Sequence, residues 1–309
     1  MTHDFQEVER AEDTRPGRSN VSTRKRNPFV SLLLVSVLIA VTVQTLYIPS
    51  LRASAATVVL VGAGDIASCS YTNDTATANL LDSISGTVFT SGDNVYPNGT
   101  SSEFTNCYHP TWGRHKSRTK PSPGNHDYRT SGAPGYFNYF RVSSYYVYNL
   151  GDWRIYALNS NIDATSSSAQ VKWLQNDLAQ NPKKCVLAYW HHPRWSSGQR
   201  GNNAKMQSAW SALYNAGADL VIAGHEHHYE RFKQMNASGS TVSSGLRQIV
   251  VGTGGAGLYP FGSIKSTSEV RNSSTHGVLK LTLTSTSYSW KFHPVAGKSF
   301  TDSGTTNCR

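Results

Sequence analysis

Charged residues are scarce in this chain, although basic residues outnumber acidic ones. Asp, Glu, Lys and Arg make up 16% of the 309 residues, against about 25% in an average soluble domain. This composition excludes a coiled coil and a highly charged disordered chain. The net charge of +10 is spread thinly, and without a basic stripe of interleaved aromatics it does not predict a nucleic-acid-binding module. Aromatic residues reach 11%, which supplies apolar surface for a core.

Cysteine is also rare, with four residues and no C-x-x-C pair. This absence argues against a zinc ribbon and a thioredoxin-type site. An even number of cysteines in an oxidising compartment favours two disulfides, for which three pairings exist. We expect Cys69–Cys107 and Cys185–Cys308, because the second would fix the C-terminal tail to the start of a strand. Free buried thiols are the alternative.

One long segment near the N-terminus has no charge at all. Residues 27–51 form this run of 25 residues, and most of 29–46 is Val, Leu, Ile or Ala. Such a run is long enough to cross a hydrocarbon core of about 30 Å. The basic residues 24–26 precede it directly, so the positive-inside rule places the N-terminus in the cytoplasm and the remainder outside.

The expected organisation is therefore a disordered cytoplasmic N-terminus at 1–27, a hydrophobic helix at 28–48 and one exported domain at 57–309. Cleavage after Ala55, in an A-x-A site, would secrete the domain, whereas an uncleaved helix would anchor it in the cell membrane. A buried core helix is the alternative for 28–48. The exported part carries a net charge of +8, which suits an anionic substrate or cell surface and equally a solvated surface without a partner.

Within 57–309, apolar runs of strand length alternate with helical periodicity, and strands then predominate. The expected strands are at 57–62, 87–90, 185–190, 220–223, 248–251, 278–283 and 288–292, with a hairpin over 145–158. The expected helices are at 75–84, 167–179 and 204–216, and 263–275 is expected to be a mobile loop. This order favours a layered α/β domain with sheets packed between helices.

Five segments that follow apolar strands carry the residue types that bind metal ions. They are Gly64-Asp65, Gly92-Asp93-Asn94-Val95-Tyr96, Gly124-Asn125-His126-Asp127, His191-His192-Pro193 and Gly224-His225-Glu226-His227-His228. Because open α/β sheets bind ligands at the carboxyl ends of their strands, we expect these segments to converge. Six of the eleven histidines lie in the last three segments, a clustering that isolated structural histidines would not produce. Asp, Asn and His without thiolate suit Zn²⁺, Mn²⁺ and Fe, and Asp93 is the natural bridge between two ions.

Taken together, these segments resemble the calcineurin-like metallophosphoesterases, and in particular their purple acid phosphatase branch. That branch carries G-D-x-x-Y, G-N-H-[DE], a strand-end His followed by x-P, and G-H-x-H-x-Y-E-R, and the resemblance extends over about residues 57–295. It implies a four-layer αββα sandwich, preceded here by one N-terminal hydrophobic helix. It also implies an exported acid phosphatase-like hydrolase of phosphate monoesters, in which a metal-bridging hydroxide attacks phosphorus. A phosphodiesterase or nucleotide hydrolase with the same centre, and a catalytically silent surface-binding protein, are the alternatives.

The resemblance also implies a ligand set for two metal ions, Fe with Zn, Mn or Fe. Metal 1 would take Asp65, Asp93, Tyr96 and His227, and metal 2 would take Asp93, Asn125, His191 and His225. Most calcineurin-like enzymes have a ligand His two residues after the first Asp, where this chain has Ala67. A Tyr96 phenolate is therefore expected to complete metal 1. His126 is the expected acid that protonates the leaving alkoxide of a small phosphorylated substrate.

The chain departs from the branch in its substrate contacts. Plant enzymes carry a further His pair about ten residues beyond the strand-end His, where this chain has Arg200-Gly201-Asn202. His192 and Arg194 are therefore the candidates for substrate binding, although support of its own loop is the preferred interpretation of His192. Arg231 is either a second group that neutralises phosphate oxygens or a structural ion-pair partner.

Overall fold

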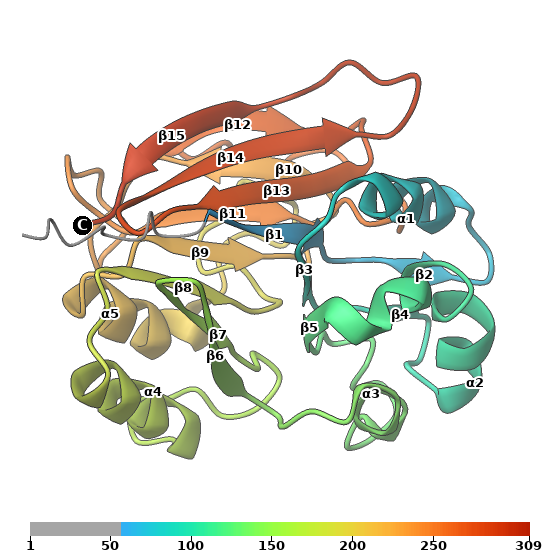
Figure 1. Cartoon of the computed structure of the whole chain (residues 1–309), viewed down its shortest axis with the longest axis horizontal. Helices are drawn as coiled ribbons and strands as arrows, with labels where there is room; N and C mark the ends of the chain where they lie inside the picture. The colour runs from blue at the N-terminus through green and yellow to red at the C-terminus, as the bar shows by residue number, and fades with distance from the viewer. Residues whose placement is uncertain (1–56) are drawn as a thin grey trace, which may run out of the picture. The chain divides into compact units, whose positions relative to one another are not determined.

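The computed structural model describes residues 57–309. The predicted cytoplasmic segment, the hydrophobic helix at 28–48 and the cleavage site after Ala55 lie outside the described residues. Among residues 57–309, no helix has the length and apolar character needed to cross a membrane. Two large sheets and the helices that flank them make up the described part (Figure 1).

The first sheet has six strands in the order β15-β14-β13-β1-β3-β5. Its strands are β1 (Val58–Ala63), β3 (Thr87–Ser91), β5 (Thr119–Ser122), β13 (Gly277–Leu283), β14 (Ser287–Pro294) and β15 (Ser303–Asn307). Strands β1, β3 and β5 run parallel, and β13 to β15 continue the sheet in antiparallel fashion. The carboxyl ends of β1, β3 and β5 therefore lie at one edge.

The second sheet has seven strands in the order β12-β10-β11-β9-β8-β7-β6. They are β6 (Tyr146–Leu150), β7 (Trp153–Ala157), β8 (Cys185–Tyr189), β9 (Leu220–Ala223), β10 (Tyr229–Phe232), β11 (Arg247–Val251) and β12 (Ser268–Asn272). Its central strands β7, β8, β9 and β11 are parallel. A separate two-stranded pair joins β2 (Ala67–Ser68) to β4 (Val95–Tyr96).

The helices are short and lie outside the sheets (Figure 1). They are α1 (Asn73–Ser83), α2 (Ser101–Glu103), α3 (Pro134–Phe140), α4 (Ala169–Gln180) and α5 (Gln207–Asn215), with a π-helical turn at Phe104–Tyr108 and 3₁₀ segments at Trp112–Arg118 and Ala204–Met206. Ser168 caps the N-terminus of α4, because its side chain accepts a hydrogen bond from the Val171 N–H and so satisfies one of the free amides of the first turn.

The packing of β8 shows how the layers are built. Its side chains alternate between two faces, as the pleat of a strand requires. Leu187 and Tyr189 belong to the core that contains the six-stranded sheet and Leu81 of α1. Val186 and Ala188 belong to a second core, which includes Leu174 of α4 and Leu213 of α5. The order helix, sheet, sheet, helix is the four-layer αββα sandwich that the resemblance implied, and this prediction is confirmed.

One sequence prediction about the fold was wrong. Residues 263–275 do not form a continuous loop, because β12 (Ser268–Asn272) lies within them and pairs antiparallel with β10. The segment SEVRN contains a single apolar residue, Val270, and none of its residues is fully buried. An edge strand of this kind is held by backbone pairing and leaves no hydrophobic pattern in the sequence.

Both predicted disulfides are present. Cys69, directly after β2, pairs with Cys107 in the π-helical turn, and their Cα atoms are 4.8 Å apart. Cys185, the first residue of β8, pairs with Cys308 after β15 at a Cα separation of 5.4 Å. No cysteine of the described part is free. The second disulfide fixes the C-terminal tail to the start of a strand, as expected.

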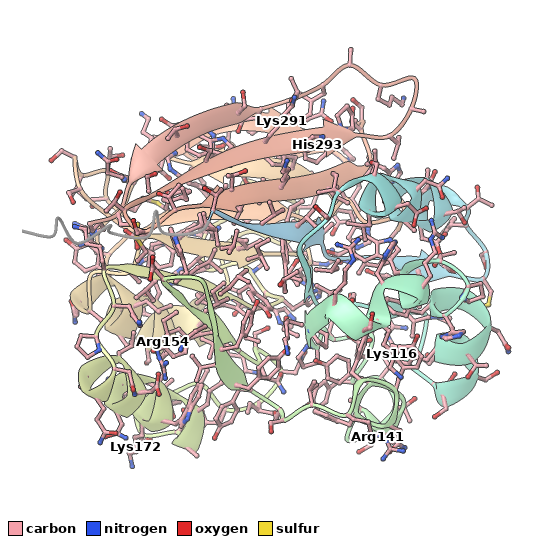
Figure 2. All side chains as sticks on the ribbon, in the orientation of Figure 1. Lys116, Arg141, Arg154, Lys172, Lys291 and His293 are labelled. Carbon is pink, nitrogen blue, oxygen red and sulfur yellow. A yellow bond between two sulfur atoms is a disulfide. The ribbon has the colours of Figure 1, made fainter. Side chains whose placement is uncertain are left out.

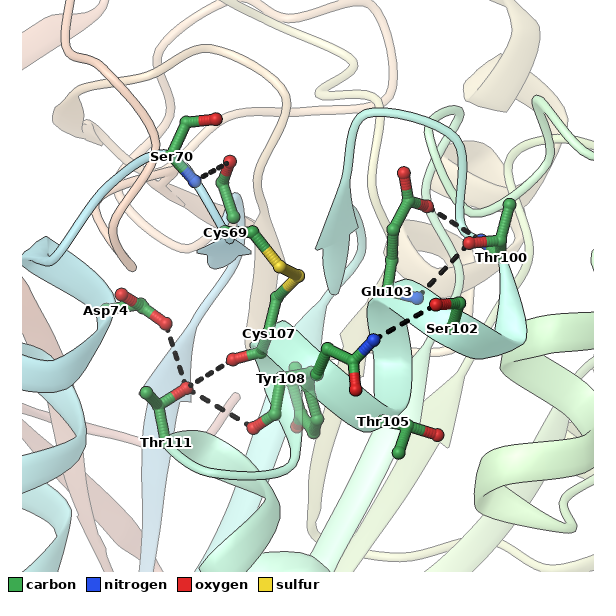
Figure 3. Close-up of a disulfide and its surroundings, with 12 residues drawn as sticks. Cys69, Ser70, Asp74, Thr100, Ser102, Glu103, Thr105, Cys107, Tyr108 and Thr111 are labelled. Atoms are coloured by element: carbon green, nitrogen blue, oxygen red, sulfur yellow. Dashed lines mark hydrogen bonds between the residues drawn. A yellow bond between two sulfur atoms is a disulfide. The ribbon is translucent and has the colours of Figure 1, made fainter.

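The first disulfide lies within a network of local polar contacts (Figure 3). The Thr111 hydroxyl lies 2.8 Å from a carboxylate oxygen of Asp74, to which it donates a hydrogen bond. Thr100 and Glu103 cap the neighbouring helix α2 reciprocally. Because β2 pairs with β4, this disulfide supports the strand that carries Tyr96.

We expect removal of the Cys185–Cys308 disulfide to lower the free energy of unfolding by about 5 kcal/mol, the loop-closure value for its length. The two cysteines are 123 residues apart, so the bond restricts a long loop in the unfolded chain. Urea unfolding of the double variant Cys185→Ser, Cys308→Ser measures the loss. The matched variant Cys69→Ser, Cys107→Ser opens a loop of 38 residues and is expected to lose about 4 kcal/mol. An unchanged free energy of unfolding in the first variant would show that the Cys185–Cys308 disulfide does not stabilise the domain.

Candidate metal centre

The seven residues predicted to bind metal lie together where strands of both sheets end. Six of these residues follow the ends of five strands by two to four residues, and the short strand β4 supplies the seventh. Asp65 follows β1, Asp93 follows β3, Asn125 follows β5, His191 follows β8, His225 and His227 follow β9, and Tyr96 ends β4. The convergence predicted from the strand ends is therefore present in the fold.

The backbone at these positions is strained. Asp65, Asp93 and His225 have φ values of 60°, 48° and 72°, in the left-handed region that costs an ordinary residue of order 1–3 kcal/mol. The glycines before His225 and Asn125 allow close approach, since a Cβ on Gly224 would lie 2.7 Å from Asp65 Oδ2 and one on Gly124 would lie 2.1 Å from Asp93 Oδ1. This strained backbone directs the side chains of Asp65, Asp93 and His225 towards one point.

The first group of donor atoms surrounds the Tyr96 hydroxyl. This oxygen lies 2.9 Å from Asp65 Oδ1, 3.1 Å from Asp93 Oδ2 and 3.2 Å from His227 Nε2. His227 Nε2 is also 3.2 Å from Asp65 Oδ1. These are the four residues that the resemblance assigned to metal 1.

The second group surrounds His191 Nε2. This nitrogen lies 3.2 Å from Asp93 Oδ2, 3.0 Å from Asn125 Oδ1 and 3.2 Å from His225 Nδ1. These are the four residues assigned to metal 2. Asp93 Oδ2 belongs to both groups, which is the position that a bridging ligand must occupy.

The spacing of the donor atoms fits metal ions. Neighbouring ligands bound 2.1 Å from an octahedral ion lie about 3.0 Å from each other, and the distances in both groups run from 2.9 to 3.2 Å. Carboxylate, phenol, amide and imidazole donors without thiolate select hard or borderline cations. The residues therefore fit two such ions that share Asp93.

Backbone carbonyls orient two of the histidines. His191 Nδ1 lies 2.9 Å from the Ser91 carbonyl oxygen, and His227 Nδ1 lies 2.7 Å from that of Gly257. A carbonyl only accepts, so Nδ1 carries the proton in each ring and the lone pair of a neutral ring is on Nε2. This is the support that metal-binding histidines require.

The charges of the cluster are strongly coupled. Burial disfavours ionisation of Asp65, but the neighbouring His227 outweighs it and lowers the pKa of that carboxyl. Burial opposes protonation of His191, yet the Asp93 carboxylate raises the pKa of His191 to about 9. Burial, together with Asp65 and Asp93, raises the pKa of Tyr96 well above 10. The two buried carboxylates thus favour a positive charge between them. A protonated imidazole or a metal cation can supply this charge.

His126 borders the cluster in an orientation suited to proton transfer. Its backbone N–H donates to Asp93 Oδ1 over 2.7 Å, and its Nδ1 donates to the Pro97 carbonyl over 2.7 Å. Its ring packs on Tyr96, with 4.3 Å between ring centroids. Nε2 is left 4.0 Å from Asp93 Oδ2, on the cluster side of the ring.

The two predicted substrate contacts differ in their surroundings. His192 has its ring 4.4 Å from that of His225 and its Nδ1 2.8 Å from the Ser160 hydroxyl. A ligand atom of His192 also lies within 4.8 Å of those of His191 and His225. Arg194 instead donates to Gln207 and stacks on the Trp195 ring.

Arg231 is part of a structural ion-pair network. Its guanidinium pairs with Asp302 and Glu269. Burial disfavours the charged guanidinium, but the hydrogen bond and the charge of Asp302 outweigh burial and raise the pKa of Arg231. Of the two roles that the sequence left open for Arg231, phosphate contact and a structural ion pair, the structure contains the ion pair.

Asp127 is a functional candidate whose role the sequence left unassigned. Burial raises the pKa of this fully buried carboxyl to about 7. It accepts hydrogen bonds from the backbone N–H and side-chain amide of Asn94 and from the Gly124 N–H. It thereby ties the loop that carries Asp93 to the loop that carries Asn125. The acidic last position of G-N-H-[DE] was the signal for it.

Comparison with known proteins decides the family. Residues 57–229, more than half of the chain, match the family described as calcineurin-like phosphoesterase. The chain belongs to this family. The prediction of a calcineurin-like metallophosphoesterase is confirmed, and the relatives below confirm its purple acid phosphatase-like branch.

Several curated relatives of this calcineurin-like phosphoesterase are purple acid phosphatases. Probable purple acid phosphatase 20 of Arabidopsis thaliana is 35% identical over 99 residues, which cover 29% of this chain and 23% of the relative. Purple acid phosphatase 22 of the same plant is 33% identical over 117 residues, which cover 36% and 27%. The chain thus spans about a quarter of the length of the curated relatives that it matches.

Solved structures share the fold of this calcineurin-like phosphoesterase. Purple acid phosphatase PPD1 from yellow lupin (Lupinus luteus) seeds has a TM-score of 0.66 at 18% identity, over 81% of this chain and 54% of the other. GAP50, the anchor in the inner membrane complex of Plasmodium, has a TM-score of 0.67 at 13% identity, over 82% and 89%. At these identities the likeness extends to the fold alone.

Proposed function

We propose that residues 57–309 form a binuclear-metal phosphoesterase that hydrolyses phosphate monoesters, as acid phosphatases do. The observation that carries the proposal is the position of Asp93 Oδ2 between the two donor groups, 3.1 Å from the Tyr96 hydroxyl and 3.2 Å from His191 Nε2. Membership of the calcineurin-like phosphoesterase family supports the reaction class.

Asp65, Asp93, Tyr96 and His227 would hold one ion, and Asp93, Asn125, His191 and His225 would hold the other. The oxygen-rich first set suits iron, and the second set suits zinc, manganese or a second iron. When bound, two such ions polarise phosphoryl oxygens and lower the pKa of water.

The residues around the ions have separate tasks. The His126 N–H fixes the Asp93 carboxylate through Oδ1, which leaves Oδ2 for both donor groups. Because the Pro97 carbonyl holds the proton on Nδ1 of His126, Nε2 is the atom that can pass a proton to the leaving alkoxide.

His192 is the better candidate for contact with the phosphate. Its ring packs on that of the predicted ligand His225. The guanidinium of the other candidate, Arg194, is held by Gln207 and Trp195.

Export is part of the proposal. Two disulfides support folding in an oxidising compartment. The domain would act outside the cytoplasm, either secreted or held at the cell membrane through residues 28–48.

Turnover of a monoester and a diester by the purified, metal-loaded chain tests the function. We expect 4-nitrophenyl phosphate to be hydrolysed with a higher kcat/KM than bis(4-nitrophenyl) phosphate. A reversed preference would favour the phosphodiesterase alternative. Absence of both activities in protein that has bound its metals would favour the silent surface-binding alternative.

The substitution Tyr96→Phe removes one of the four donors at the first site. It is expected to weaken metal binding there by about 10- to 100-fold or more, since loss of a group that only supports a ligand already has this cost. It is also expected to abolish the visible charge-transfer band of an iron-loaded protein. Absorption spectra and metal analysis of the iron-loaded wild type and variant measure both effects. Tyr139→Phe is the matched control, because the Tyr139 hydroxyl bonds His109 away from the cluster. If Tyr96→Phe leaves spectrum, metal content and rate unchanged, Tyr96 is not a ligand.

A further inference from the structure

Arg200 places a positive charge beside the donor cluster, close enough to offset part of the rise that burial causes in the pKa of the Glu226 carboxyl, but without an ion pair among the residues that the structure describes. Its Nη1 lies 3.0 Å from the carbonyl oxygen of His225, to which it donates a hydrogen bond, and it also contacts the Tyr259 hydroxyl. Among residues 57–309, no carboxylate oxygen lies within 4.0 Å of its guanidinium, whereas four other arginines there do form ion pairs. These are Arg114, Arg154, Arg231 and Arg247.

The backbone of Arg200 is fixed to the segment that bears the ligands. Its N–H donates to Glu226 Oε1 over 2.9 Å. Glu226 is buried, and in the sequence it stands between the two predicted ligands His225 and His227. Gly198 lies directly against this carboxylate, since a Cβ there would come within 2.2 Å of Glu226 Oε2. The loop that carries Arg200 is thus held on the ligand segment by a buried acid.

Tyr259 fixes the side chain of Arg200 from the opposite loop. Its hydroxyl donates to the same His225 carbonyl over 2.8 Å, and its ring lies 4.7 Å from the His227 ring between centroids. The Arg200 guanidinium lies 5.1 Å from the centroid of the Tyr259 ring, within cation–π range. Arg200 and Tyr259 together therefore form one wall next to both predicted metal sites.

We propose that Arg200 binds a second anionic group of the substrate, so that the preferred substrates are phosphate monoesters that also carry a carboxylate or a further phosphate. This inference rests on the proposed function. Arg200 contacts the His225 carbonyl and not a donor atom, so its charge lies beside the predicted ion positions and meets a part of the substrate beyond the scissile phosphate. Its Nε and Nη2 have no partner in the described part of the chain, and they form the fork that matches an oxyanion.

Two matched phosphonates that cannot be hydrolysed test the proposal by calorimetry on the metal-loaded full chain. Propylphosphonate and 3-phosphonopropionate differ only in a terminal methyl or carboxylate group. We expect wild type to bind 3-phosphonopropionate about 10- to 100-fold more tightly, the range of a charge-assisted contact. Arg200→Gln is expected to remove most of this difference without changing metal content or propylphosphonate affinity, and Arg200→Lys to retain part of it.

Arg141→Gln is the matched control, because Arg141 is an exposed residue at the end of α3 (Figure 2). It is expected to leave both affinities unchanged. Equal wild-type affinities for the two phosphonates, or no binding of either, would overturn the proposal. An equal loss of both affinities in Arg200→Gln would also overturn it, since Arg200 would then act on the shared phosphonate.

A kinetic comparison separates this inference from the proposed function. The substrates are 3-phosphoglycerate and glycerol 3-phosphate. The first carries a carboxylate where the second carries a hydroxymethyl group. Turnover without a preference for 3-phosphoglycerate would contradict the role of Arg200 and leave the phosphatase function in place. Selective binding of 3-phosphonopropionate without turnover of either ester would support the anion site and contradict the function.

Discussion

Replacement of Asp93 by alanine is expected to abolish phosphate ester hydrolysis and to lower metal content at both sites. Asp93 Oδ2 is the one donor atom within 3.2 Å of both the Tyr96 hydroxyl and His191 Nε2 in residues 57–309. Loss of both ions removes several kcal/mol of charge stabilisation, and about 5 kcal/mol corresponds to a loss of about 10⁴-fold in rate. Steady-state kinetics and metal analysis of the same preparation measure both effects.

A second acid substitution provides the control for Asp93→Ala. Asp152 is exposed in the turn between β6 and β7, and Asp152→Ala is expected to retain wild-type rate and metal content. Circular dichroism of both variants checks that the sandwich remains folded. An Asp93→Ala protein with two ions per chain and near-normal turnover would contradict the assigned ligands.

Replacement of His126 by glutamine is expected to reduce kcat for an alkyl phosphate by about 10²- to 10⁴-fold, the range of general acid catalysis. The loss should be smaller for 4-nitrophenyl phosphate, because 4-nitrophenolate leaves without a proton. Metal content should not change, since the hydrogen bond from His126 to Asp93 comes from the backbone N–H, which glutamine retains. Kinetics with the two substrates measure the difference.

His109→Gln controls for the loss of an imidazole, because His109 is exposed and bonds the Tyr139 hydroxyl. It is expected to behave as wild type with both substrates. Equal losses for the alkyl and the nitrophenyl ester in His126→Gln would show that His126 does not protonate the leaving group.

The sequence predicted the convergence of the donor residues because their positions follow from strand order. Asp65, Asp93 and Asn125 each follow a strand of one parallel set, and the ends of parallel strands share an edge. Short apolar runs identified β1 and β3, as well as β8 (Cys185–Tyr189) of the other sheet, in which every residue is buried. Strand β5, with the sequence TKPS, has no such run and was not among the expected strands. The glycines before the donors were equally visible. A Cβ on Gly64, Gly124 or Gly224 would come within 3.0 Å of atoms in other segments, and Gly92 has a φ of 87°.

The sequence could not predict features that depend on contacts between distant segments. Arg194 directly follows the strand-end segment that carries His191 and His192, which made it the candidate for substrate binding, yet Gln207 and Trp195 hold its guanidinium. Arg200, six residues later, is brought to the cluster by Glu226 and Tyr259. No local pattern specifies these partners, because they are 26 and 59 residues away.

Asp127 and β12 illustrate the same limit. The hydrogen bonds of Asp127 join loops that are 33 residues apart in the sequence. Strand β12 forms by pairing with β10 and has no apolar periodicity of its own. Both features depend on the completed fold, and the sequence shows only residue types that are compatible with them.

The number of metal ions bound per chain tests the central claim most directly. Metal analysis of the reloaded full chain, normalised to protein by amino-acid analysis, should give two ions for wild type. Because each imidazole belongs to one donor group, His227→Ala and His225→Ala should each retain about one ion. A wild-type protein that binds a single ion, or none, under loading conditions that saturate it would contradict a centre built around a shared Asp93.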